Sequence, residues 1–146
     1  MKMSVKAVLG IVLATVFFTI PAHAGTITGT AQVVDGDTVI INGVTVRLKG
    51  VDAAELKTGL GERAKLGMRK IAEGRIITCD LTGEKTHGRE VGFCSVSGGR
   101  DINQAIIEDG YALACARYSK KYVSFEKGTM INQRRADYCI DNSADN

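Results

Sequence analysis

Apolar and polar positions alternate through the first part of the chain, a pattern typical of β-strands with one buried face. Residues 30–41 (TAQVVDGDTVII) and 44–51 (VTVRLKGV) are rich in β-branched side chains. Asn42-Gly43 joins them, and this pair is the strongest two-residue signal for a hairpin turn. We therefore predict a tight β-hairpin whose register is counted outwards from this turn.

A second pair of strands is predicted further along the chain. Residues 75–81 (RIITCDL) and 90–96 (EVGFCSV) have strand composition, and the polar segment 82–89 (TGEKTHGR) between them reads as a loop.

Between these pairs the period changes to that of a helix. Residues 61–74 (GERAKLGMRKIAEG) bring one set of positions onto a common face: Ala64, Leu66 or Gly67, Met68 and Ile71. Gly74 suits a C-terminal stop.

Two more helices are predicted towards the C-terminus. Residues 101–114 (DINQAIIEDGYALA) suit a helix that is capped at its N-terminus by Asp101 and ends near Gly110. Residues 122–139 (YVSFEKGTMINQRRADYC) suit a third helix that Gly128 and Thr129 interrupt. Strands, a helix, more strands and terminal helices predict a small α+β domain on a compact antiparallel barrel.

The first 24 residues have a different character. Lys2 and Lys6 precede the apolar run AVLGIVLATVFFTI, and PAHA ends at Ala24 in a small-x-small pattern. The run is about fourteen residues, shorter than the roughly 17–25 of a membrane span. We expect a secretory signal peptide at 1–24, cleaved after Ala24, with an uncleaved anchor as the alternative. One domain over residues 25–140 and a frayed tail at 141–146 would follow.

If the leader is removed on export, the net charge of the mature chain and the expected state of its cysteines both change. Loss of Lys2 and Lys6 with the leader lowers the formal net charge from +3 to +1, so overall basicity does not indicate nucleic-acid binding. Four cysteines remain in the mature chain, and an even count in an exported protein favours disulfides. Cys79 and Cys94 flank the second predicted hairpin and are paired on that ground, which leaves Cys115 with Cys139.

The candidate site lies at the open end of the first hairpin. Pairing Ile41 with Val44 places Thr38 opposite Arg47, so Asp37 lies beside Arg47. Asp52 and Glu55 follow as the second strand ends, so sequence geometry alone can gather all four groups. The alternative is a turn and a solvated loop, but surface charges have no reason to collect at one end of one hairpin.

The kinds of residue in this cluster suggest a chemistry. Carboxylates and a backbone carbonyl suit Ca²⁺ or Mg²⁺, and an arginine fork matches phosphate oxygens. His87 is the only histidine after the leader, which excludes a two-histidine nuclease mechanism and a His-rich zinc site. Phosphodiester hydrolysis needs a base, a cation and donors to the phosphate. Glu55, a divalent ion, Arg47 and Arg89 could fill those roles.

Four motifs, between roughly residues 30 and 122, together resemble those of a known family, the staphylococcal-nuclease-like (thermonuclease) proteins. They are VVDGDTV, VRLKGVDAAE, HGRE before an apolar strand, and DINQAIIEDGYALA. The arrangement is most similar to the exported bacterial branch. The resemblance implies a five-stranded OB-fold β-barrel with about three α-helices. It also implies a Ca²⁺-dependent endonuclease that hydrolyses DNA and RNA with little sugar specificity and leaves 3′-phosphate ends.

The resemblance assigns roles position by position. Asp37 and Asp52 would be calcium ligands, with the backbone carbonyl of Ala53. Glu55 would be the base, and Arg47 and Arg89 would hold the scissile phosphate. Ala54 replaces the family's usual proline.

The resemblance also implies substrate contacts beyond the scissile phosphate. Thr86 and His87 stand at positions that contact the terminal phosphate of a nucleotide, and Tyr118 matches a tyrosine of the nucleotide pocket. For His87 an ordinary exposed loop residue is the alternative. The strip ARYSKKY (116–122) either tracks phosphates and stacks bases or is a solvated helix lead-in.

Three functions remain open from the sequence. The first is a periplasmic or secreted monomeric nuclease that prefers single-stranded DNA and RNA and keeps no stable membrane association once the signal is cleaved. The second is an inactive OB-fold module that binds single-stranded nucleic acid or a protein partner in the cell envelope. The third is an exported accessory protein that acts on another anionic polymer. The presence of Asp37, Arg47, Asp52, Glu55 and Arg89 together favours the first.

Overall fold

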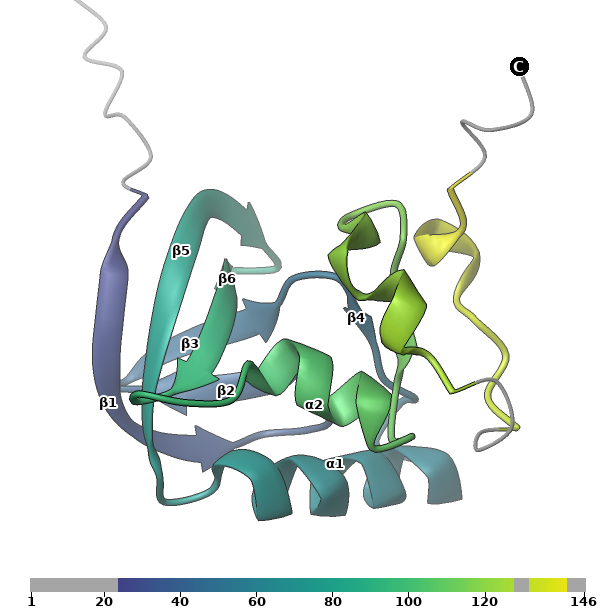
Figure 1. Cartoon of the computed structure of the whole chain (residues 1–146), viewed down its shortest axis with the longest axis horizontal. Coiled ribbons are helices and arrows are strands. Elements are labelled where there is room, and N and C mark those ends of the chain that lie inside the picture. Colours follow the sequence, from purple (N-terminus) through teal and green to yellow (C-terminus); the bar gives the residue numbers. More distant parts are fainter. Residues whose placement is uncertain (1–23, 128–131, 142–146) are drawn as a thin grey trace, which may run out of the picture.

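The core of the molecule is a closed five-stranded barrel. The computed structural model describes residues 24–127 and 132–141. The barrel strands are β1 (Thr26–Val33), β2 (Thr38–Ile41), β3 (Val44–Leu48), β5 (Ile76–Thr86) and β6 (Arg89–Val96). They are arranged in the order β1-β2-β3-β6-β5, and β5 closes the barrel by pairing with β1 (Figure 1). This confirms the predicted α+β class and OB-fold barrel. The barrel is mixed rather than wholly antiparallel, because β3 and β6 run parallel.

The first hairpin has the predicted register. Ile41 pairs with Val44 and Thr38 with Arg47. Asn42 and Gly43 have φ values of 50° and 79°. A two-residue turn that matches the twist of the strands requires positive φ at both positions. The positions of Asp37 and Arg47 at the open end therefore follow directly from the turn.

The second hairpin is longer than predicted. The segment 82–86, expected in a loop, is strand, and the turn is confined to His87 and Gly88, with φ values of 48° and 76°. The register shifts between Leu81 and Lys85. The hairpin therefore extends beyond the body of the barrel and carries its turn towards the candidate site.

Two α-helices pack beside the barrel. α1 (Gly59–Ala72) begins at Thr58, whose hydroxyl accepts from the Gly61 amide, and Gly74 follows it with φ 71°. α2 (Ile102–Glu108) is capped by Asp101, as predicted. Both lie along one side of the barrel in Figure 1, where α1 runs beneath α2.

The C-terminal part differs from the predicted third α-helix. Lys120–Phe125 forms a 3-10 helix, η1, and Asp137–Cys139 a short 3-10 turn, η2. The residues 132–136 between them are not helical, and Gly128 and Thr129 lie outside the described residues. A two-stranded sheet of β4 (Val51–Asp52) and β7 (Leu113–Ala114) connects this part to the barrel.

Both predicted disulfides are present. Cys79 and Cys94 are direct cross-strand partners in β5 and β6. Cys115, just after β7, is bonded to Cys139 in the C-terminal segment. All four cysteines are buried. Disulfides of this kind are compatible with an extracellular or periplasmic location.

The proposed leader falls mostly outside the described part of the chain, which begins at Ala24. No helix within residues 24–127 and 132–141 is long and apolar enough to cross a membrane.

Candidate active site

Asp37 and Arg47 form an ion pair at the open end of the first hairpin. Arg47 Nη1 lies 3.0 Å from Asp37 Oδ2, and both side chains are largely shielded from solvent. The same Arg47 nitrogen donates to the main-chain carbonyls of Asp37 and Leu48. The guanidinium is therefore fixed at the base of the site by three contacts within one hairpin.

Thr38 links this pair to Arg89 on β6. The Thr38 hydroxyl is buried, donates to Asp37 Oδ1 at 3.0 Å and accepts from Arg89 Nη1 at 3.3 Å. Arg89 Nε also donates to the Thr86 carbonyl, which fixes the guanidinium against the second hairpin. The structure thus brings the two predicted phosphate-binding arginines into one network, and Thr38 is a member that the sequence reasoning missed.

Asp52 and Ala53 leave β4 on the other side of Asp37. The Ala53 amide donates to Asp37 Oδ2 at 3.3 Å, so the loop is tied to the hairpin. Asp52 is buried, and its Oδ2 accepts from the Ala136 amide of the C-terminal segment at 2.8 Å. One carboxylate oxygen of a predicted metal ligand is therefore engaged by a part of the chain to which no function had been assigned.

Burial controls the charge of both aspartates. It raises the pKa of Asp37 to about 7, and the nearby Arg47 guanidinium offsets only part of this effect. Burial also raises the pKa of Asp52, which the Ala136 amide and Arg47 partly oppose. Two desolvated carboxylates gain from a neighbouring positive charge, as cation-binding groups do.

Glu55 lies at the mouth of the site and is exposed. Its backbone carbonyl accepts from the Thr58 amide and hydroxyl at the start of α1, which fixes the loop that carries it. Its carboxylate has no hydrogen-bond or ion-pair partner among the described residues. The side chain is therefore available to a substrate or a water molecule.

These groups line one cleft of about 720 Å³. Every predicted site residue except Asp52 contributes to its wall: Asp37, Arg47, Ala53, Glu55, Thr86, His87, Arg89 and Tyr118. His87 is an exposed turn residue there. Tyr118 is 54% exposed. Lys49, Lys85 and Tyr138 also line the cleft, and the sequence reasoning assigned them no role.

Tyr138 is the least expected member. It lines the cleft from η2, beside the Arg47 side chain. Burial and the Asp52 charge raise its pKa. No local sequence signal marks this residue, because it reaches Arg47 only through the fold and the Cys115–Cys139 bond.

The strip at 116–122 is divided between core and surface. Tyr122 is fully buried, and its hydroxyl donates to Asp101 at 3.0 Å. Lys121 pairs with the same carboxylate and Lys120 with Asp141. Only Tyr118 of this strip lines the cleft, so most of it is structural.

The predicted metal ligands are of the type that calcium binds. Asp37, Asp52 and the Ala53 carbonyl offer hard oxygens, as Ca²⁺ requires, although six to eight ligands are usual, so water and phosphate oxygens would supply the rest. Within the described ranges, no three His, Cys, Asp or Glu side chains cluster closely enough to hold a metal ion by themselves.

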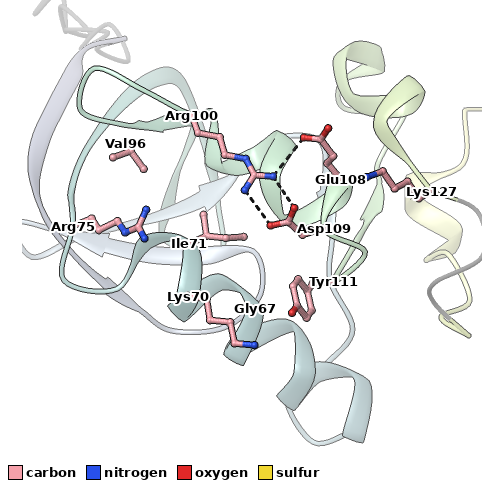
Figure 2. Close-up of a pocket in the computed structure, with 10 residues that line it drawn as sticks. All are labelled: Gly67, Lys70, Ile71, Arg75, Val96, Arg100, Glu108, Asp109, Tyr111 and Lys127. Atoms are coloured by element: carbon pink, nitrogen blue, oxygen red, sulfur yellow. Dashed lines mark hydrogen bonds and ion pairs between the residues drawn. The ribbon is translucent and has the colours of Figure 1, made fainter.

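A second, smaller cavity of about 420 Å³ lies between α1, α2 and Arg100. Figure 2 shows Arg100 there, with its guanidinium turned towards Glu108 and Asp109. The Arg100–Asp109 contact is 2.7 Å. The two carboxylates therefore share Arg100 as their ion-pair partner, and none of the predicted catalytic residues lines this cavity.

The chain is thus a closed OB-fold barrel with two buried aspartates and two linked arginines beside one cleft. Residues 45–135, more than half of the chain, match the family described as staphylococcal nuclease homologue. The chain belongs to this family, whose members are nucleases acting on phosphodiester bonds and typically depend on calcium. Membership supports a nuclease-like or nucleic-acid-binding function in general. No curated protein matches the chain closely enough to add a relative.

Proposed function

We propose that the protein is a calcium-dependent endonuclease that hydrolyses phosphodiester bonds of DNA and RNA with little sugar specificity. One observation carries this proposal. Arg47 and Arg89 are joined through Asp37 and Thr38 into one hydrogen-bonded network, which lines the same cleft as the unpartnered carboxylate of Glu55.

The two arginines hold the scissile phosphate. A guanidinium presents a planar set of donors that matches phosphate oxygens, and two of them can stabilise the extra negative charge that develops as water adds to phosphorus. Because Arg47 and Arg89 are fixed before substrate binds, little reorganisation is required. This is the form of electrostatic catalysis in which donors are aimed at the developing charge.

Glu55 takes the proton from the attacking water. Its carboxylate is exposed in the cleft, so it can accept a proton from water held between it and the phosphate. The bond from phosphorus to the 5′ oxygen then breaks, and the departing 5′ oxygen takes a proton from solvent. This leaves a 3′-phosphate end on one product and a 5′-hydroxyl on the other.

Asp37, Asp52 and the Ala53 carbonyl would hold the calcium ion. When bound, Ca²⁺ neutralises charge on the phosphate and lowers the pKa of water. Asp37 carries a dual role here, because it also orients Arg47 at 3.0 Å.

The remaining proposals concern the chain as a whole. Residues 25–140 form the nuclease domain, residues 1–24 are a cleaved leader, and the mature protein acts as a monomer in the periplasm or outside the cell. Two disulfides support such a location. Single-stranded DNA and RNA are the preferred substrates, because an open cleft with half-exposed tyrosines suits unpaired bases.

Replacement of Glu55 by Gln tests the assignment. We expect Glu55→Gln to lower the turnover of single-stranded DNA by about 10²–10⁴-fold, the usual contribution of a general base. Binding of the same DNA in chelator should be retained. Glu62→Gln is the matched control, because Glu62 is an exposed glutamate in the first turn of α1 outside the cleft lining.

The outcomes distinguish the two main functions. If Glu55→Gln and Glu62→Gln are equally active, Glu55 is not the base. If the unmodified, folded protein binds single-stranded DNA but never cleaves it, the alternative of an inactive binding module is correct.

A further inference from the structure

The C-terminal segment 132–141 is attached to the candidate site at several points. Gln133 Nε2 donates to the Asp52 carbonyl at 2.9 Å, and the Ala136 amide donates to the Asp52 carboxylate at 2.8 Å. Arg135 is paired with Glu126 at 2.8 Å and also donates to the Ala114 carbonyl. The segment is therefore a fixed wall of the site over most of its described length.

The disulfide places two tyrosines at the same cleft. Cys139 directly follows Tyr138, and its partner Cys115 lies three residues before Tyr118. The Arg117 amide donates to the Cys139 carbonyl at 3.3 Å, and the Tyr118 amide donates to the Cys115 carbonyl at 3.1 Å. The bond thus ties together the two turns from which the tyrosines project.

Both rings are available to a ligand. Tyr118 is 54% exposed and Tyr138 49% exposed, and both line the cleft that contains Arg47 and Glu55. A single exposed tyrosine on a surface needs no explanation. Two at one cleft, next to a pair of arginines suited to phosphate, form the combination that binds unpaired nucleotides: cationic groups for the backbone and aromatic faces for the bases.

We propose that Tyr138 is a substrate-binding residue, whose ring stacks on a base of single-stranded nucleic acid while Arg47 holds the neighbouring phosphate. Its side chain lines the cleft together with Arg47 and is 49% exposed, so a base can reach it from solvent. The matched family region ends at residue 135, so this contact comes from a part of the chain beyond it. The proposal rests on the proposed nuclease function of the cleft.

Binding in the absence of hydrolysis tests this role separately from catalysis. The measurement is the dissociation constant of a fluorescent single-stranded oligothymidylate in chelator, at one fixed ionic strength because such binding depends on salt. We expect Tyr138→Ala to weaken binding about 5- to 150-fold, the usual effect of removing one base-stacking ring. Tyr138→Phe keeps the ring and should bind within about twofold of the unmodified protein.

Ile140→Ala is the matched control, because Ile140 is 44% exposed on the other side of Cys139 and does not belong to the described lining of the cleft. Its affinity and melting temperature should match those of the unmodified protein. The half-exposed position of Tyr138 means that Tyr138→Ala should also melt at nearly the unchanged temperature.

A spectroscopic test reports the stacking itself. The chain contains no tryptophan, so Tyr138→Trp introduces one tryptophan, whose emission can be excited apart from that of the tyrosines, at the proposed contact. We expect the oligonucleotide to quench its emission. Unchanged emission at saturating oligonucleotide would overturn the proposal.

Two binding results would also overturn it. One is a Tyr138→Ala variant that binds within about twofold of the unmodified protein, and the other is a Tyr138→Phe variant as weak as Tyr138→Ala. Either result would leave the proposed nuclease intact if the unmodified protein still binds and cleaves. A protein that neither binds nor cleaves single-stranded DNA would instead contradict the proposed function.

Discussion

Asn103 joins α2 to the two parallel strands of the barrel, and its removal should cost much of the stability of the fold. The side chain is fully buried. Its Oδ1 accepts from the Cys94 amide at 3.0 Å, and its Nδ2 donates to the Lys49 and Gly92 carbonyls at 2.9 and 3.3 Å. We predict that Asn103→Ala lowers the free energy of unfolding strongly, although Asn103 itself does not line the cleft.

The magnitude follows from the partners that remain. The Gly92 carbonyl still accepts from the Lys49 amide at 2.9 Å, so it keeps a donor. The Cys94 amide and the Lys49 carbonyl lose their side-chain partner. Each buried group left unsatisfied costs about 1–3 kcal/mol, which gives roughly 2–6 kcal/mol in total. Asn103→Asp should be worse still, because it places a carboxylate against two carbonyl oxygens.

The assay is urea unfolding followed by circular dichroism, with both disulfides intact. Gln104→Ala is the matched control on the next position of α2. The only hydrogen bond that the Gln104 side chain makes among the described residues is a 3.5 Å contact with Glu108. Such a pair contributes only a few tenths of a kcal/mol. If Asn103→Ala unfolds within about 1 kcal/mol of Gln104→Ala, the reasoning about Asn103 is wrong.

Two further predictions concern the site and its attachment. Thr38→Val removes the hydroxyl between Asp37 and Arg89 and should lower kcat on single-stranded DNA by about tenfold, the order of one charge-assisted hydrogen bond. Thr38→Ser should restore most of it, and equal activity of the Val and Ser variants would show that the hydroxyl link is unimportant. Replacement of Cys115 and Cys139 together by Ser should cost roughly 3 kcal/mol in urea unfolding and weaken oligonucleotide binding in chelator. Replacement of Cys79 and Cys94 by Ser should affect stability alone, so equal loss of binding in both pairs would contradict the attachment of Tyr138 through the disulfide.

The site was predictable from the sequence where it depends on local geometry. Asn42-Gly43 determines the hairpin register, and the register alone places Asp37 beside Arg47. The disulfide between Cys79 and Cys94 follows from the second hairpin in the same way. The end of that hairpin was missed because His87-Gly88 was read as part of a loop. The glycine at its second position, with φ 76°, was the available signal.

The features of the site that the sequence did not predict depend on contacts between distant parts of the chain. Asp52 lies close to Asp37 in sequence, but its carboxylate is engaged by Ala136, 84 residues away. Tyr138 lies beside Arg47 because the Cys115–Cys139 bond and the contacts of Gln133, Arg135 and Ala136 hold its segment against the site. The predicted third helix failed for a related reason. The polar contacts of Gln133, Arg135 and Ala136 fix residues 132–136 in a non-helical path along the site.

The most direct test of the account is digestion of single-stranded DNA by the purified protein, first with calcium and then with excess chelator, with analysis of the product ends. We predict hydrolysis in calcium that leaves 3′-phosphate ends, and no hydrolysis in chelator. Cleavage that continues in chelator would contradict the metal site at Asp37, Asp52 and Ala53. No cleavage in either condition, by a protein that is folded, would contradict the nuclease itself.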